Sequence, residues 1–246
     1  MEEKMFERKK FKAAALAQLK GRWKIPVLAT LLTYALIGIF ATAALAVFGL
    51  NFLATDNDYS LSALGNSGFF ISYSPSRMSE FIDIILSGVA VVFIVAILSV
   101  HNTMFKESRK IYFSDFTNGL NQWWQAFRGG LWFILWVFAW SLLFLIPGIV
   151  KYYSYSMMFF IMAENPKIGV CKAMQISKEL TRGYKGELFV LDLSFIGWAI
   201  LASIPCGLGY IWLAPYGFMT KTNAYQYLKQ AALDTNRVSL ADFEQI

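Results

Sequence analysis

The chain has 246 residues and a formal net charge of +6; 57% of its residues are hydrophobic and only 15% are charged. Average soluble domains carry about a quarter charged residues, so this composition argues against a soluble globular protein. The basic residues flank apolar runs instead of covering a soluble face, which argues against nucleic-acid binding.

The first apolar run, residues 25–54, contains no charged residue. About 20 apolar residues cross the hydrocarbon core of a bilayer, so the run predicts a transmembrane helix. The preceding residues 1–24 are too long, too charged and too acidic for the start of a signal peptide. We interpret them as a retained cytoplasmic amphipathic segment.

Five further apolar segments follow along the chain. They are residues 81–100, 130–146, 148–163, 188–204 and 208 to about 222. Short turns at Pro147 and Pro205 join the last four segments into two hairpins. Proline favours such turns because it lacks a backbone donor and ends a helix. The pattern predicts an all-α, integral membrane helical bundle of about six transmembrane helices. Its three hairpins are residues 25–54 with 81–100, residues 130–163 and residues 188–222.

Charge predicts the orientation of these hairpins, because short cytoplasmic loops carry an excess of Lys and Arg. Residues 1–24 and 164–187 are rich in these bases, whereas residues 55–80 contain Arg77 beside several carboxylates. We therefore expect 55–80 to form an outside loop and 164–187 a cytoplasmic amphipathic segment. Residues 223–246 become a cytoplasmic tail, so that both termini are cytoplasmic.

A version with four spans is the alternative. Residues 148–163 and 208–222 are barely long enough to cross the hydrocarbon core, and they could be re-entrant instead.

A repeated pattern accompanies the last two hairpins. Each has an aromatic residue seven positions before its proline and another five positions after it: Trp140, Pro147 and Tyr152, then Trp198, Pro205 and Tyr210. Residues 19–24 and 180–185 also resemble each other. These matches suggest three units, each a basic amphipathic segment followed by a helical hairpin. The alternative is that interfacial aromatics, bases and turn residues recur in any membrane protein.

The segment 164–187 contains an amphipathic pattern. On a helix, one side would carry Val170, Ala173, Met174, Ser177 and Leu180, and the charged residues would lie away from it. This predicts basic amphipathic interfacial helices whose Lys and Arg meet anionic headgroups, at roughly 1 kcal/mol each. The candidate headgroup contacts are Lys172, Lys178, Arg182, Lys185, Arg22 and Lys24. Ordinary positive-inside topology without lipid specificity is the alternative.

Four stretches carry a family resemblance: residues 142–157 (LLFLIPGIVKYYSYSM), 163–166 (AENP), 180–185 (LTRGYK) and 191–198 (LDLSFIGW). They resemble the multi-pass membrane proteins of domain-of-unknown-function family 975, found mainly in Gram-positive bacteria. The resemblance implies a bacterial plasma membrane protein. It implies no activity, because the family is similar only distantly to the membrane part of some glycerophosphodiesterases.

Groups for catalysis or metal binding are scarce in this sequence. The single histidine, His101, has no Cys or carboxylate at ligand spacing, so we expect it to be a polar residue at a helix end. Cys171 and Cys206 are predicted on opposite membrane sides and should not form a disulfide. We therefore expect no catalytic residue, no metal and no cofactor.

Two charged residues inside predicted spans are the candidate functional polar residues. Asp192 lies well inside the fifth span, and Lys151 lies just after the turn at Pro147. A charge in a span is costly and usually faces protein or water. The alternatives are a structural hydrogen bond for Asp192 and snorkelling to headgroups for Lys151. A direct pair is not expected, because the two are predicted near opposite membrane faces.

The sequence thus favours a non-catalytic integral membrane protein, a scaffold, regulatory or accessory subunit that binds a membrane protein partner or anionic membrane lipids. A small transporter or channel with a polar path through the bundle is the alternative hypothesis. Few charges lie within the spans, which counts against it.

Overall fold

The computed structural model describes residues 6–35, 38–39, 42, 77–107, 109–143, 145–205 and 207–243; of residues 77–90 and 141–146 it describes the backbone only. Every regular element in these parts is an α-helix, which confirms the all-α prediction for the described residues. Residues 43–76, which are the end of the first predicted span and most of the predicted outside loop, lie outside them.

The helices are α1 (Arg8–Leu19), an apolar helix at Lys24–Ala35, α3 (Arg77–Lys106), α4 (Phe113–Leu120), α5 (Trp123–Leu143), α6 (Leu145–Tyr155), α7 (Met158–Glu164), α8 (Val170–Leu180), α9 (Lys185–Leu193), α10 (Ile196–Ser203), α11 (Tyr210–Asp234) and α12 (Leu240–Phe243).

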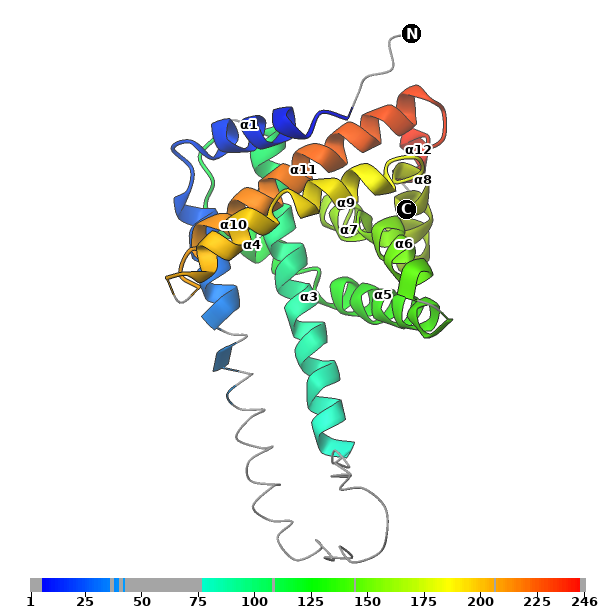
Figure 1. Ribbon diagram of the computed structural model, residues 1–246, viewed down its shortest axis with the longest axis horizontal. Helices are drawn as coiled ribbons and strands as arrows, with labels where there is room; N and C mark the ends of the chain where they lie inside the picture. Colours follow the sequence, from blue (N-terminus) through cyan, green and yellow to red (C-terminus); the bar gives the residue numbers. More distant parts are fainter. Residues whose placement is uncertain are drawn as a thin grey trace, which may run out of the picture.

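Helix α3 is the centre of the molecule. It packs against α4, α5, α7 and α11, which lie far apart in the sequence (Figure 1). Val95, Ala96 and Leu98, on different sides of the helix, are all at most 1% exposed. A helix that is apolar on all sides is stable only when it is enclosed, and here other helices enclose its C-terminal half.

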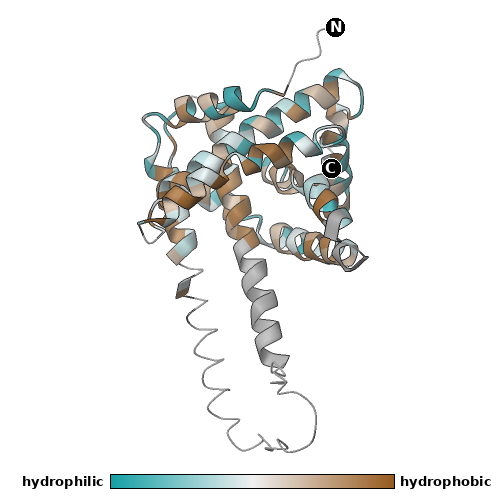
Figure 2. Ribbon diagram, in the orientation of Figure 1, coloured by the Kyte–Doolittle hydropathy of each residue, from teal (hydrophilic) through white to brown (hydrophobic). Residues whose placement is uncertain are grey.

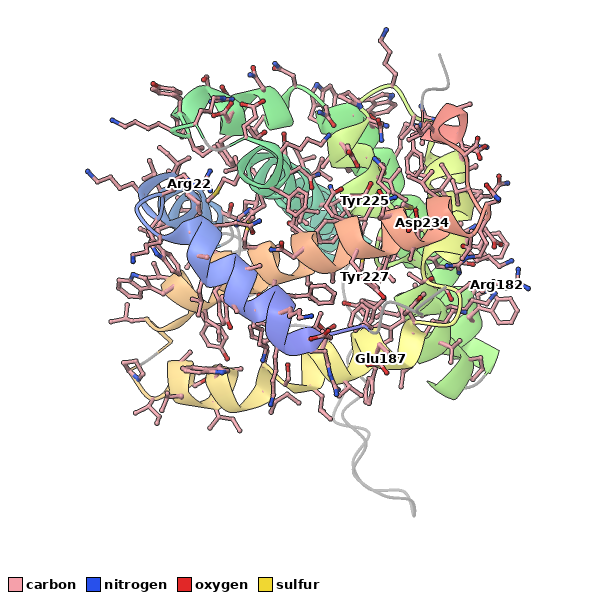
Figure 3. The ribbon with its side chains drawn as sticks, turned by 90° about the horizontal axis from the view of Figure 1, so that it is seen from above. Arg22, Arg182, Glu187, Tyr225, Tyr227 and Asp234 are labelled. Carbon is pink, nitrogen blue, oxygen red and sulfur yellow. The ribbon has the colours of Figure 1, made fainter. Side chains whose placement is uncertain are left out.

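The other hairpins run across α3 instead of beside it. In Figure 1 the far end of the α5–α6 hairpin and the far end of the α10–α11 hairpin lie on opposite sides of α3. Figure 3, seen from above, shows α9 and α10 lying alongside α11, with α1 crossing over α11. The described helices are therefore not a set of parallel rods, and the six-span arrangement stays a prediction.

The first and third predicted units share their local structure. Helix α1 ends at Leu19 and the next helix begins at Lys24; α8 ends at Leu180 and α9 begins at Lys185. A glycine in each turn adopts the left-handed conformation, with φ of 77° at residue 21 and 87° at residue 183. Helix α4 likewise precedes the longer α5, so each predicted unit places a short helix before an apolar one.

The predicted apolar side of α8 is buried, but not in a membrane. Its five residues, Val170, Ala173, Met174, Ser177 and Leu180, are all buried. Helices α5, α6, α7 and α11 pack against α8. The expectation of an interface-lying helix is corrected here, because protein already covers the side that would have entered the lipid.

Two predicted boundaries differ from the structure. Helix α6 begins at Leu145, so Pro147 lies in its first turn, where a missing backbone donor costs nothing. Helix α11 continues to Asp234, well beyond the predicted end of the third hairpin near residue 222. The predicted tail from residue 223 is therefore largely helical.

One helical stretch in the described part of the chain is long and apolar enough to cross a membrane: Lys185–Ser203, formed by α9 and α10. Figure 2 shows hydrophobic residues over α10 and α3, and hydrophilic ones over α1 and the far end of α11. Large apolar side chains are exposed along α5, α9 and α10: Leu131, Ile134, Leu135, Phe138, Phe189, Leu193, Ile196, Trp198, Ile200 and Leu201. Soluble monomers rarely expose so much apolar surface.

Gly119 allows α4 to lie directly on α3. A Cβ atom at this position would be 2.6 Å from the Cα atom of Ala96, so the backbones would have to separate. We expect Gly119→Ala to destabilise the protein by about 1–3 kcal/mol through overpacking. Thermal unfolding of the detergent-solubilised protein should show a lower midpoint.

Gly186→Ala is the matched control, because a Cβ there meets nothing within 4 Å. Alanine is the better helix former, so this variant should be neutral or slightly stabilised. Equal midpoints for the two variants would contradict the close packing of α4 on α3.

Candidate functional site

An apolar pocket lies between α3, α5, α6, α7, α9 and α11. Its volume is about 350 Å³. Aliphatic and aromatic side chains make up most of its wall: Val91, Ile94, Leu98, Phe133, Ile134, Met157, Phe159, Phe160, Leu188, Leu191 and Phe218. Several of these residues come from helices that only the tertiary fold brings together.

An ion pair lies at the polar end of this pocket. The carboxylate of Asp192 is 2.9 Å from the ammonium of Lys221, and the hydroxyl of Tyr153 donates to the same carboxylate at 3.3 Å. The two charged side chains are 28% and 35% exposed, so each is partly shielded from solvent. The pair is neutral as a whole, and its polar atoms face an otherwise apolar space.

The sequence identified Asp192 but not its partner. Asp192 on α9 and Lys221 on α11 are nearly equally far along the chain from the turn at Pro205. Antiparallel helices joined by a turn bring such residues to the same level, so the hairpin geometry could have predicted the pair.

Lys151 lies in a different place from the one expected. Its ammonium is 4.2 Å from the centre of the Trp140 ring, a cation–π contact. Lys178 and Lys185 are close enough for their charges to act on it. The six-span prediction had placed Lys151 on the opposite side of the membrane from these two lysines, and the structure brings all three together because α6 packs on α8 and α9.

The other candidate headgroup contacts divide into two groups. Lys172 pairs with Asp242 at 2.6 Å, and Arg22 donates to the carbonyl of Glu107 at 2.9 Å. The charged groups of Lys172 and Arg22 therefore already bind other groups of the protein. Lys24 and Arg182 are exposed, although Arg182 also lies 3.5 Å from Glu179. Figure 3 shows Arg22 and Arg182 at opposite edges of the molecule, so the predicted bases do not form a single surface.

The sequence reading missed a second charged cluster, centred on Glu164 at the end of α7. Its side chain is only 5% exposed. The carboxylate accepts from Lys106 at 2.7 Å, from Lys229 at 2.9 Å and from the Tyr225 hydroxyl at 2.5 Å. Lys106 ends α3, and the other two donors lie on α11. One carboxylate therefore joins three helices.

Electrostatics keeps Glu164 ionised. Burial alone would raise the pKa of its carboxyl, but the hydrogen bonds from Lys106 and Tyr225 and the charge of Lys229 outweigh that effect and lower the pKa below its usual value of 4.5. The sequence suggested only that residues 164–166 end one helix and start another. A carboxylate directly after the apolar residues 157–163 was the available signal for a buried cluster.

His101 is wholly buried, with 0% exposure, which corrects the expectation of a polar residue at a helix end. Its Nδ1 atom is 2.7 Å from the carbonyl oxygen of Ile97, and its ring lies 5.8 Å from that of Phe218 on α11. In the part of the chain that the structure describes, no group of three or more His, Cys, Asp or Glu residues is arranged to hold a metal ion.

A family model described as "protein of unknown function (DUF975)" matches residues 78–232. The chain belongs to the DUF975 family. The matched region of this DUF975 chain contains the pocket, the Asp192–Lys221 pair and the Glu164 cluster. No curated protein and no solved structure matches the chain.

We expect Glu164→Gln to lower the free energy of unfolding at pH 7 by about 1–3 kcal/mol, because it leaves two lysines without their carboxylate. The folded-state pKa of Glu164 is depressed, so this stabilisation is present above the usual pKa of 4.5 and is lost as the pH falls through the folded value. Thermal unfolding at pH 7 and at lower pH should therefore show a shrinking difference between the variant and the wild type.

The matched control is Glu187→Gln, because Glu187 is exposed on α9 (Figure 3). We expect little change at either pH. A Glu164→Gln variant as stable as this control at pH 7 would contradict a joining role for the cluster.

Proposed function

We propose that this protein is a non-catalytic integral membrane protein that binds a lipid chain in the pocket between α3 and α11, and that it acts as a scaffold, regulatory or accessory subunit. The observation that carries the proposal is a pocket of about 350 Å³ with an apolar wall and one neutral ion pair at its end.

The size and lining of the pocket support a lipid ligand. Ligand sites range from about 300 to 1,000 Å³ and are mostly apolar with a few placed polar groups. Each buried methylene group contributes about 0.8 kcal/mol to binding, so an alkyl chain gains from every apolar residue it contacts. Asp192, Lys221 and Tyr153 supply hydrogen-bonding groups for the polar end of such a molecule.

The rim of the pocket supports entry from the side. Ile134 and Tyr152 line the pocket and are 45% and 42% exposed, so the pocket opens at the surface of α5 and α6. That surface also exposes Leu135, Phe138 and Val150. In a membrane, a lipid chain would pass from the bilayer into the pocket without leaving an apolar environment.

The membrane assignment belongs to this proposal. Its supports are the apolar stretch Lys185–Ser203, the exposed apolar side chains and the uncharged residues 25–54. We propose a multi-pass protein of the bacterial plasma membrane with both termini in the cytoplasm, spanning it six times as three hairpins. The bases of residues 164–187 support this orientation through the positive-inside rule.

The location of Lys151 supports the four-span version instead. With residues 148–163 re-entrant, Lys151 and residues 164–187 would both lie outside, which agrees with the proximity of Lys151 to Lys178 and Lys185. The two versions therefore place Cys171 on opposite sides of the membrane. The bases of residues 164–187 agree with six spans and the neighbours of Lys151 agree with four, so the side of the membrane on which Cys171 lies distinguishes the two versions.

The geometry favours lipid binding over transport. A transport path needs polar groups along its length. The polar groups of this pocket gather near Asp192, whose charge is neutralised by Lys221, and the remaining wall is largely apolar. A membrane protein partner stays a prediction.

We expect Ile134→Trp to fill the pocket and weaken lipid binding about tenfold, equivalent to about 1.4 kcal/mol. The protein would be delipidated in detergent and titrated with phosphatidylcholine, and bound lipid would be counted by native mass spectrometry. Leu135→Trp is the matched control, since the neighbouring Leu135 is 56% exposed and lies outside the pocket lining. Equal binding by both variants and the wild type would overturn the pocket as the lipid site.

Cys171 is exposed on α8 and can report the topology. In a Cys206→Ser variant it would be the remaining cysteine. Six spans place α8 in the cytoplasm, so they predict that a membrane-impermeant maleimide labels Cys171 in inverted vesicles and not in right-side-out vesicles. A permeant maleimide controls for reactivity. Labelling in right-side-out vesicles would favour the four-span version.

A further inference from the structure

Three lysines lie on helices that pack together beside the pocket: Lys151 on α6, Lys178 on α8 and Lys185 at the start of α9. The charges of Lys178 and Lys185 act directly on Lys151. Hydrogen bonds fix the contact between α6 and α8 nearby. The hydroxyls of Ser177 and Thr181 donate to the carbonyl of Ser154, one turn after Lys151, at 2.9 and 3.3 Å.

These lysines have no carboxylate partner among the described residues. The ion pairs there involve other bases, and Glu179, next to Lys178, is paired with Arg182. The positive charges of Lys178 and Lys185 oppose that of Lys151, so a bound anion would stabilise the arrangement.

The cluster lies at the α6–α9 edge of the apolar pocket. Tyr152 and Tyr153, which follow Lys151 directly, line the pocket, and so does Leu188, one turn after Lys185. Ile149 and Val150, which precede Lys151, are 45% and 43% exposed. A positive site therefore borders both an apolar cavity and an exposed apolar surface, which is the arrangement that an anionic amphiphile requires.

We propose that Lys151, Lys178 and Lys185 bind the headgroup phosphate of an anionic phospholipid whose acyl chain occupies the adjacent pocket. This inference rests on the proposed function and specifies the lipid class. It retains two of the bases that the sequence suggested as headgroup contacts and adds Lys151. It leaves out Lys172 and Arg22, because protein groups already occupy them. A soluble phosphate would use the lysines but not the pocket, which favours the lipid.

The test compares two lipids with the same acyl chains, phosphatidylglycerol and phosphatidylcholine, on the full-length protein delipidated in detergent. We expect the wild type to bind phosphatidylglycerol about tenfold more tightly, since each nearby base attracts the anionic headgroup. The variant Lys151→Gln/Lys178→Gln/Lys185→Gln should lose this preference and keep its affinity for phosphatidylcholine. High salt should reduce the preference in the wild type.

The control removes the same charge elsewhere, with Lys9→Gln/Lys20→Gln/Lys110→Gln at three exposed lysines. It should keep the preference, and so should Lys151→Arg, which retains the positive charge. Retained phosphatidylcholine binding shows that the triple variant is folded. If the triple variant does not fold, the single variant Lys151→Gln serves as the test, and it should show a reduced preference for phosphatidylglycerol. Free glycerol phosphate should not displace the lipid.

The outcomes separate this inference from the proposed function. Equal affinity of the wild type for both lipids, or a preference unchanged in the triple variant, would overturn the headgroup site. So would displacement by glycerol phosphate. Each of these three results leaves the proposed lipid binding in the pocket standing if Ile134→Trp still weakens that binding. Binding of neither lipid would overturn both.

Discussion

The buried carboxylate of Glu164 is the interaction on which the described structure depends most. A carboxylate that is 5% exposed is tolerated only when cations and hydrogen-bond donors surround it, and here they come from the end of α3 and from α11. Lys229 also lies 4.5 Å from the ring of Phe243, so α12 joins the same cluster. The cluster fixes α11 relative to α3 and α7, and these helices form the walls of the pocket.

The pocket follows from this arrangement and from the way the hairpins cross α3. Helices that cross leave space between their contact points, and aromatic and aliphatic side chains fill the space only partly. The Asp192–Lys221 ion pair joins α9 to α11. The same two side chains also line the apolar pocket and supply its polar groups. Lys151, Lys178 and Lys185, on helices packed at the neighbouring edge, add positive charge to this region.

Much of the local structure could be predicted from the sequence, and the misses share one cause. The helical segments and the apolar side of α8 followed from hydrophobic periodicity. The cost of a charge in an apolar run drew attention to Asp192, which forms an ion pair in the structure. The partner of Asp192, the neighbours of Lys151 and the burial of His101 did not follow from such local patterns. Each depends on which helix lies beside which, and residues such as Glu164 and Lys229 are far apart along the chain.

The sequence by itself determined that this chain is helical in its described parts, and that it belongs to the DUF975 family. Hydrophobic periodicity and motif order are local properties, so they can be recognised in the sequence without knowledge of the fold. Only the tertiary structure decided that α6, which carries Lys151, packs on α8 and α9 beside an apolar pocket, and that one glutamate joins three helices. The reason is that contacts between distant segments arise from packing geometry, which the spacing of residues along one helix does not encode.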